Sequence, residues 1–377
     1  MVASRQSNRS RELIKDSRAY YCLECGKCTA RCPIARADTS FSPVLNIAKT
    51  IRGYDQEILR NGAIWACMTC EACSNACPSD VDYPRLVLGM RAEAFQTGDE
   101  RFHRQNLERI FLGEGQKEEF GIFREISSVQ TSVVTHDGGV VTSLLIEGLN
   151  SDFFDAAIVV RRGYNQNAEA YIAENSEDII SAKGSKYELI PIPEKLIEAV
   201  QERGKKRIAV VGLPCQVIGI REIQKSLPDV VLTVIGLFCM ENFRRNLLKS
   251  CIADILHVDL DTAERVSISK GNFIVSIGGK TTSCKVKDLI AAVRTGCLFC
   301  TDFTSELADI SVGTVGSPDG YSTVITRSQK GEDLFNLLKD YNRTSADCSE
   351  ITRMAAWKEK HGTAQLKSLF SWGADER

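Results

Sequence analysis

The sequence predicts a protein of two parts that combines the α+β and α/β classes: a helical N-terminal part, residues 1–115, and an α/β part, residues 116–377. Three observations support this prediction. A chain of 377 residues is long enough for two domains. Two cysteine runs of the same spacing stand among helix-like segments within the first hundred residues. Beyond residue 150, strand-like and helix-like segments alternate.

Composition and charge narrow the possible functions. Hydrophobic residues make up 43% of the chain and charged residues 25%, which is typical of a globular protein. Lys and Arg total 47 against 49 Asp and Glu, so the basic excess of a nucleic-acid-binding protein is missing. The N-terminal residues contain no apolar signal core, and the longest apolar runs, 207–220 and 230–240, are too short to span a bilayer. We therefore expect a cytoplasmic protein that is not integral to a membrane.

The 15 cysteines are the outlying feature of the composition. Dense, regularly spaced cysteine in a cytosolic chain indicates metal binding rather than disulfides. Two runs, "CLECGKCTARCP" and "CMTCEACSNACP", both have the spacing C-x2-C-x2-C-x3-C-P. The first run supplies Cys22, Cys25, Cys28 and Cys32, and the second supplies Cys67, Cys70, Cys73 and Cys77.

This spacing is typical of a ferredoxin that holds two [4Fe–4S] clusters. Three thiolates of one run bind one cluster, and the fourth cysteine binds the other. We therefore predict one cluster on Cys22, Cys25, Cys28 and Cys77, and a second on Cys67, Cys70, Cys73 and Cys32. The alternative is a pair of zinc sites, but zinc usually takes two C-x-x-C pairs separated by a longer loop.

Helical periodicity surrounds the two runs. We predict helices over 42–60, 83–96 and 101–111, followed by a linker over 111–121. Residues 15–112 resemble the C subunit of heterodisulfide reductase in "YYCLECGKCTARCPIAR", in Trp65 and in "VDYPRLVLGMR". The resemblance implies two clusters that pass electrons to a partner like the A and B subunits of that enzyme.

The α/β part offers a third group of cysteines. The segments 154–160, 168–174, 207–215 and 230–239 read as strands, with a helix over 217–227 that predicts a parallel pair. Cys215 and Cys239 follow two such strands, and the carboxyl ends of parallel strands meet at one edge of a sheet. Cys297 and Cys300 form a C-x-x-C pair that could complete a four-cysteine site. From spacing alone, iron–sulfur and zinc both remain open, as does a structural role for Cys215 and Cys239.

Residues 116–345 resemble the beta-subunit family of coenzyme F420-reducing hydrogenase and dehydrogenase. The resemblance lies in "HDGGVVTSLLIEGL", "GSKY", "GLPCQVIGI", "GLFCMENF", "CLFCTDFTSELADISVGTVG" and "GYSTVITR". It implies FAD, coenzyme F420 as the hydride substrate, and a third [4Fe–4S] cluster on Cys215, Cys239, Cys297 and Cys300. Leu213 stands where the family often has a threonine.

Glycine turns and hydroxyls predict where FAD binds, because backbone amides at helix N-termini suit its phosphates. The resemblance supports the same segments. The candidate cofactor-binding residues are Gly138, Gly139, Thr142, Ser143, Gly184, Ser185, Lys186, Tyr187, Lys270, Asp309, Ser311, Gly313, Gly316 and Ser322. The phosphate and glutamyl tail of coenzyme F420 need basic residues, for which Arg161, Arg162, Lys186, Lys270, Lys285 and Arg294 are candidates.

The sequence thus predicts an electron-transfer flavoprotein subunit. Hydride transfer between F420 and FAD needs stacked rings rather than a general base, so we predict no catalytic side chain. Two alternatives remain: the same cofactors acting on another hydride substrate, such as a chlorophyll derivative, or a relay that has lost its flavin.

Overall fold

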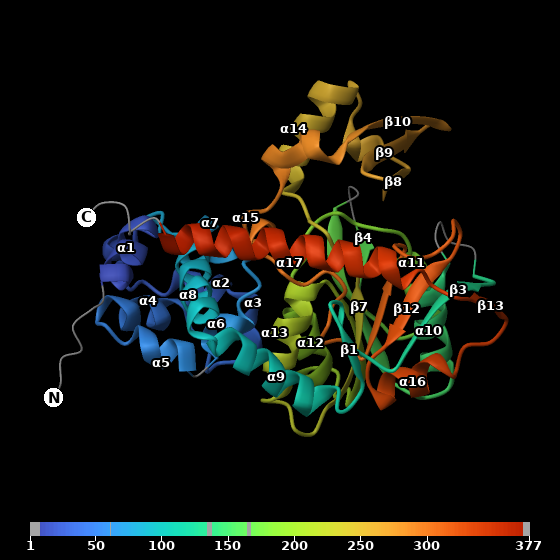
Figure 1. The fold of residues 1–377 in the computed structure, drawn as a ribbon, viewed down its shortest axis with the longest axis horizontal. Coiled ribbons are helices and arrows are strands. Elements are labelled where there is room, and N and C mark those ends of the chain that lie inside the picture. The colour runs from blue at the N-terminus through green and yellow to red at the C-terminus, as the bar shows by residue number, and fades with distance from the viewer. Residues whose placement is uncertain (1–7, 61, 134–137, 164–166, 372–377) are drawn as a thin grey trace.

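The fold was analysed in a computed structural model, which describes residues 8–60, 62–133, 138–163 and 167–371. Figure 1 shows a helical part at one end and a sheet at the other, joined along their length by a C-terminal helix. The helical part contains α1 (Asn8–Asp16), α2 (Lys27–Arg31), α3 (Pro33–Ala37), α4 (Pro43–Ile51), α5 (Asp55–Arg60), α6 (Ala63–Ala66), α7 (Ala72–Asn75), α8 (Tyr83–Thr97) and α9 (Asp99–Phe111).

The three helices predicted in this part are present, with one difference. The predicted helix over 42–60 is divided into α4 and α5, because Gly53 takes a left-handed backbone conformation with φ 83°. Ser42 caps α4 by accepting a hydrogen bond from the amide of Leu45, and Asp82 caps α8 in the same way. The two cysteine runs lie in the loops and short helices that this frame holds.

The predicted linker over 111–121 contains structure that the sequence analysis missed. A short hairpin, β1 (Gln116–Glu118) and β2 (Gly121–Phe123), stands there. Gly121 has φ 90°, and a side chain on it would collide with Glu306. The link is therefore packed onto the α/β part.

The α/β part is built on an eight-stranded sheet in the order β13-β3-β12-β11-β7-β6-β4-β5. Its strands are β3 (Glu125–Thr131), β4 (Ala156–Arg162), β5 (Ala168–Ala173), β6 (Arg207–Gly212), β7 (Val231–Leu237), β11 (Ile310–Gly313), β12 (Ser322–Thr326) and β13 (Tyr341–Thr344). The predicted parallel pairing of β6 with β7 is confirmed. The strand predicted over 168–174 is also present, but it runs antiparallel to β4.

Helices cover both faces of this sheet: α10 (Val140–Asn150), α11 (Ser176–Ser181) and α16 (Gln329–Phe335) on one, and α12 (Pro193–Gln201) and α13 (Pro214–Gln224) on the other. Alternate strand residues face opposite cores, as a doubly covered sheet requires. Ile158 and Val210 pack toward α13, whereas Ala157 and Ala209 pack toward α10.

A smaller unit stands apart from the main sheet (Figure 1). It contains α14 (Arg245–Leu256) and a three-stranded sheet of β8 (Arg265–Ser269), β9 (Asn272–Ile277) and β10 (Lys280–Lys285). Phe243, Phe273 and Leu289 form its core. The chain then returns to the main body through α15 (Thr295–Leu298).

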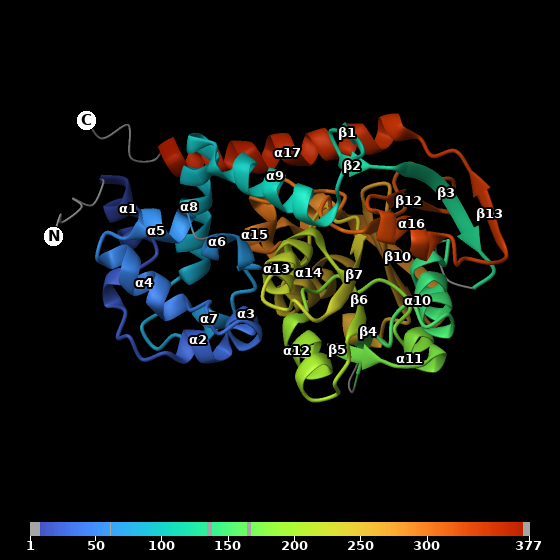
Figure 2. The ribbon, with the colours of Figure 1, turned by 90° about the horizontal axis from the view of Figure 1, so that it is seen from below.

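The two parts of the chain share one hydrophobic core. Ile34 and Met68 of the helical part belong to the same buried cluster as Val217 and Ile220 of α13. The final helix, α17 (Cys348–Ser371), packs against both α8 and α15, and Figures 1 and 2 show it running along the molecule from the sheet to the helical part. The parts are therefore not independent packing units.

Candidate functional site

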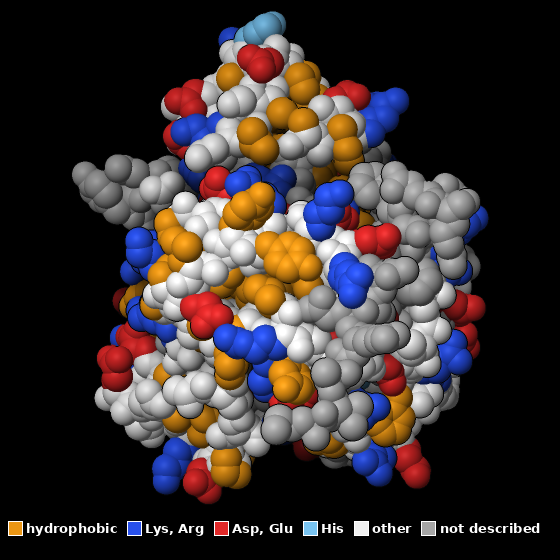
Figure 3. All heavy atoms as spheres, turned by 90° about the vertical axis from the view of Figure 1, so that its left-hand side faces the viewer, with side chains coloured by type: hydrophobic (Ala, Val, Ile, Leu, Met, Phe, Trp, Pro, Cys, Tyr) orange, Lys and Arg blue, Asp and Glu red, His pale blue; other side chains and the backbone are white. Residues whose placement is uncertain are grey.

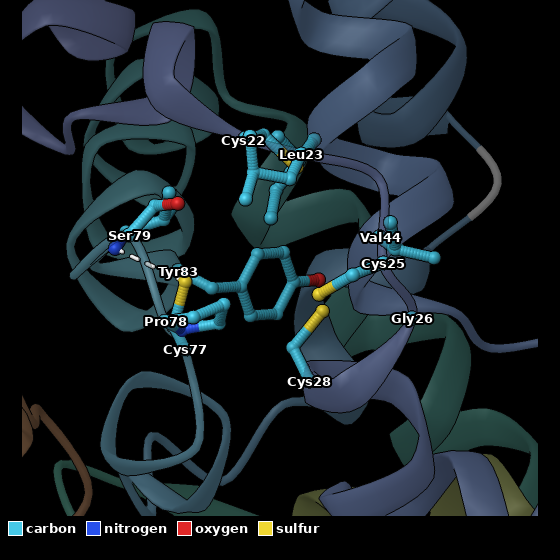
Figure 4. A pocket seen from close by; sticks show the side chains of 12 residues that line it. Cys22, Leu23, Cys25, Gly26, Cys28, Val44, Cys77, Pro78, Ser79 and Tyr83 are labelled. Carbon is cyan, nitrogen blue, oxygen red and sulfur yellow. Dashed lines mark hydrogen bonds between the residues drawn. The ribbon is translucent and has the colours of Figure 1, made fainter.

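The first cysteine site combines residues from both runs. One pocket is lined by Cys22, Cys25, Cys28 and Cys77, together with Leu23 and Tyr83 (Figure 4). Gly26, with φ 75°, stands at the N-cap of α2 and turns the loop so that Cys25 and Cys28 face the same pocket. The structure thus brings together the four residues that the crossed-ligand prediction groups. We call this group site one.

Site two is the complementary set. A second pocket is lined by Cys32, Cys67, Cys70 and Cys73, with Pro33 and Tyr83 beside them. Burial, together with the neighbouring charges of Cys67 and Cys70, raises the pKa of Cys32 to about 12. Buried thiols that destabilise one another's ionised form suit a cation, which binds them as thiolates. The amide of Thr69 donates to Cys67 Sγ at 3.4 Å, a contact that stabilises a ligating thiolate.

Tyr83 separates the two sites and borders both pockets. Its hydroxyl oxygen accepts a hydrogen bond from Asn46 Nδ2 at 2.9 Å, and its side chain is buried. Site one is the more exposed site, since Cys25 is exposed and Leu23 at its rim is 70% exposed.

Site three lies at the carboxyl edge of the main sheet. Cys215 stands in the first turn of α13 after β6, Cys239 follows β7, and Cys297 lies in α15 with Cys300 just beyond it. Burial raises the pKa of Cys215, and the charges of Cys300, Cys297 and Cys239 raise it further. The structure therefore brings all four predicted cysteines together.

Four-cysteine groups are found at both zinc and iron–sulfur sites. Within the described ranges, no group of three or more Cys, His, Asp or Glu residues is arranged to hold a single metal ion. Zinc binds sulfur at about 2.3 Å and draws its ligands to one point, whereas each thiolate of a [4Fe–4S] site binds a different iron. Groups of four cysteines can serve either metal, and a [4Fe–4S] cluster uses one thiolate for each of its irons.

Arg91 on α8 lies between site two and site three. Its Nη2 donates to the carbonyl oxygens of Ile64 at 2.6 Å and Cys67 at 2.5 Å. Burial lowers the pKa of Arg91, and the opposing charges of Cys67, Cys215 and Cys300 show that both sites are near it. Arg91 was not among the residues predicted from the sequence, because its place between the sites depends on the packing of α8.

A second contact joins the loops of the same two sites. A side chain at Gly296, beside Cys297, would lie 2.1 Å from Thr69 Oγ1, so the two loops touch. Arg294 donates to the carbonyl oxygen of Thr69 at 3.1 Å and is buried. Arg294 was a candidate for the tail of coenzyme F420, but the structure uses it here.

Part of the candidate flavin set gathers at the carboxyl edge of the sheet. A side chain at Gly138 would meet the amide nitrogen of Ser322 at 2.6 Å, so these two backbones lie against each other. Gly139, the N-cap of α10, has φ 72° and carries no side chain that could cap the helix amides, and helix N-termini favour anions. Ser143 donates to Thr131 Oγ1 at 2.8 Å, and Thr142 also lies in the first turn of α10. The start of α10 therefore remains the candidate position for a phosphate.

Gly184, Ser185 and Lys186 follow α11. Lys186 donates to the carbonyl oxygens of Ala182 and Lys183, and it is half-buried. Burial, with help from the charge of Arg162 at the end of β4, lowers the pKa of Lys186 to about 8. Lysine has three donors, and among the described residues these two carbonyl oxygens are partners that Lys186 bonds.

Other candidates have structural partners. Asp309 lies just before β11, at the edge of the sheet opposite the cysteines. Its carboxylate accepts a hydrogen bond from the amide of Val234 at 2.7 Å and forms an ion pair with Arg221 at 3.1 Å. Ser311 is buried and accepts from Arg327 Nε at 2.8 Å. Both residues therefore have partners in the core, as buried polar groups need, and their assignment to the cofactor stays a prediction.

The remaining candidates are dispersed. Tyr187 accepts from the amide of Ile268 and packs on Phe273, so it anchors the small sheet. Lys270 lies in the turn between β8 and β9 of that sheet. Side chains at Gly313 and Gly316 would collide with Phe238 and Ile351, which shows close packing at these glycines.

The α/β part is similar in sequence to proteins of a known family. Residues 130–196 match the family described as coenzyme F420 hydrogenase/dehydrogenase, beta subunit N-term, and 205–348 match its C terminus. The coenzyme F420 hydrogenase subunit beta of Methanothermobacter thermautotrophicus is 33% identical over 226 residues, which cover 57% of this chain and 80% of the relative. The chain belongs to this beta-subunit family.

Further matches agree with family membership. The corresponding subunit of Methanococcus voltae is 38% identical over 206 residues, covering 53% of this chain and 74% of the relative. A coenzyme F420-dependent sulfite reductase of Methanocaldococcus jannaschii is 32% identical over 273 residues, covering 65% of this chain but only 42% of the relative. A chain of the F420-reducing [NiFe] hydrogenase complex from Methanosarcina barkeri superposes with a TM-score of 0.64 at 27% identity, over 68% of this chain and 95% of that one.

Beyond the beta-subunit match, residues 18–81 match a 4Fe-4S dicluster domain. This stretch contains both cysteine runs, so the match supports iron–sulfur binding there. The match does not test the resemblance to a heterodisulfide reductase subunit. Within the described residues, every helix is too short or too polar to cross a bilayer.

Proposed function

We propose that this beta-subunit family member transfers electrons between coenzyme F420 and a protein partner through FAD and three [4Fe–4S] clusters. FAD, when bound, supplies the chemistry that takes up a hydride and passes on single electrons. The ligands are Cys22, Cys25, Cys28 and Cys77 at site one, Cys67, Cys70, Cys73 and Cys32 at site two, and Cys215, Cys239, Cys297 and Cys300 at site three.

The observation that carries the proposal is the order of the three cysteine sites. Site three lies at the edge of the sheet where the flavin candidates gather, Arg91 links it to site two, and Tyr83 links site two to site one. Electron transfer falls steeply with distance, so a series of adjacent sites suits a relay. The series leads from the buried sheet edge to the exposed Cys25.

The outer end of this series is suited to a partner. Large exposed hydrophobic side chains of the helical part include Tyr20, Tyr21, Leu23, Leu45 and Tyr54. Figure 3 views this end of the molecule and shows hydrophobic side chains gathered among Lys and Arg. Such patches mark interaction surfaces. The partner we propose resembles the A and B subunits of heterodisulfide reductase.

The chain's own residues serve binding and orientation. The uncapped start of α10 and the backbone at Gly138 would hold the FAD phosphates, and Lys186 would add a positive charge. Coenzyme F420 is the hydride substrate that the family relationship favours, since relatives are F420 hydrogenase subunits.

Metal content and activity test the proposal together. Anaerobically purified protein should contain about 12 Fe per chain, as three [4Fe–4S] clusters require, and one FAD. Reduced coenzyme F420 should reduce a viologen dye, and NADH and NADPH should not. About 8 Fe with zinc in addition would make site three a zinc site, while activity with a nicotinamide alone would replace the proposed substrate.

One variant separates chemistry from the relay. Cys297→Ser should retain FAD and lose about four Fe, and it should fail to pass electrons to the partner. Cys251→Ser is the matched control, because Cys251 lies in α14 outside the three sites. Full transfer to the partner by Cys297→Ser would reject the relay.

A further inference from the structure

Lys358 of α17 is a buried positive charge at site three. The residue is 4% exposed, and its Nζ donates a hydrogen bond to the carbonyl oxygen of Cys239. A carbonyl is neutral and cannot balance an ammonium, and a buried charge without a countercharge is strongly unfavourable. The neighbours of Lys358 must therefore supply negative charge.

The cysteines of site three can supply that charge when they bind a cluster as thiolates, since Lys358 directly contacts one of them; Glu241, two residues from Cys239, also interacts with Lys358. Lys358 bonds the backbone of Cys239, and the loop of Cys300 packs on α17 one turn further along. Asp302 follows Cys300 in the same loop, and its carboxylate oxygens already accept from the amide of Glu306 at 3.1 and 3.3 Å.

The fold fixes Lys358 in this position. Gly362, one turn further along α17, packs so closely on the loop of Cys300 that a side chain there would lie 2.5 Å from the carbonyl oxygen of Cys300. The other end of α17 packs on α8 (Figures 1 and 2). The family match ends at residue 348, so this helix lies almost entirely outside it.

We propose that Lys358 is the electrostatic partner of the site-three cluster and raises its reduction potential. Each one-electron reduction adds a negative charge to the cluster, and a fixed ammonium nearby stabilises that charge because attraction is strong where water is excluded. The effect favours electron flow from the flavin edge toward site three. This inference rests on the proposed third cluster.

The test removes the positive charge of Lys358 and keeps a side chain of similar volume. In Lys358→Met, a redox titration followed by electron paramagnetic resonance should show one of three cluster signals shifted to lower potential. We expect at least a tenfold change in its reduction equilibrium, about 59 mV for one electron. Lys358→Arg should titrate close to the wild type. Lys360→Met removes the same charge from an exposed position on α17 and should leave all three potentials unchanged.

The outcomes separate the inference from the proposed function. Three signals at wild-type potentials in Lys358→Met would overturn the role of Lys358 and leave the relay intact. Loss of site-three iron in both Lys358→Met and Lys358→Arg would show that shape matters rather than charge, and would also overturn it. A wild-type protein with about 8 Fe would remove the third cluster, and with it both proposals.

Discussion

Arg244 and Glu71 form a two-pronged ion pair across the boundary between the two parts of the chain. Nε and Nη2 of Arg244 donate to the two carboxylate oxygens of Glu71 at 2.9 and 2.7 Å. Glu71 lies between Cys70 and Cys73 of site two, and Arg244 is the N-cap of α14, shortly after Cys239 of site three. The pair therefore sets how the two sites face each other.

A double-mutant cycle tests this pair. Glu71→Ala and Arg244→Ala should each lower the free energy of unfolding by about 1–3 kcal/mol, because each removes charge-assisted hydrogen bonds. The double variant should cost little more than either single one, since all three lose the same interaction. Thermal midpoints of the cluster-loaded protein measure this effect. Simple addition of the two single costs would show that the residues act separately.

If the fourth cysteine of each run binds the cluster of the other run, replacing it should remove the signal of that other cluster. Cys32→Ser should abolish the same paramagnetic resonance signal as Cys67→Ser, and Cys77→Ser the same signal as Cys22→Ser. The reason is that Cys32 lines the pocket of the second run and Cys77 that of the first. Spectra of the four reduced variants decide it. If Cys32→Ser instead resembled Cys22→Ser, each run would hold its own cluster.

Lys186 predicts a pH dependence of flavin binding. Burial and Arg162 lower its pKa to about 8, so the free protein carries this charge below pH 8 and loses it above. Affinity for FAD should be constant below pH 8 and then weaken by up to roughly tenfold per pH unit. Lys186→Arg, which stays charged, should remove this dependence. Fluorescence titration of the apoprotein measures it, and an unchanged profile in the arginine variant would exclude Lys186 from the phosphate site.

The shared core predicts that residues 116–377 do not fold well alone. Gly219 on α13 packs closely on the helical part, since a side chain added at Gly219 would lie 3.1 Å from the carbonyl oxygen of Ala66. Removing the helical part would expose this face of α13. It would also strip the partner helix from α17. We expect the fragment to aggregate or to melt well below the full chain. A soluble fragment with wild-type flavin content and thermal midpoint would show that the parts are separable.

The sequence was most informative where function depends on local spacing. The runs at Cys22–Cys32 and Cys67–Cys77 group their residues within a few positions, and the structure gathers them in the expected crossed sets. The flavin candidates stay predictions. Gly138 and Ser322 meet, but Asp309 and Ser311 have buried structural partners, because glycines and hydroxyls in strand–loop–strand segments serve packing as readily as binding.

By itself, the sequence determined the two cysteine runs, the parallel β6–β7 pair and the helical frame around the runs, since each depends on short-range periodicity or spacing. The third group of cysteines was predicted from strand ends and a family resemblance, because its members lie far apart in the chain. Tertiary structure alone decided the order of the sites and the residues between them. Arg91 and Lys358 look like ordinary surface charges in the sequence, and only the packing of α8 and α17 brings them to the cysteines. Contacts between residues more than a hundred positions apart, such as Lys358 with Cys239, leave no local pattern because the chain's overall path creates them.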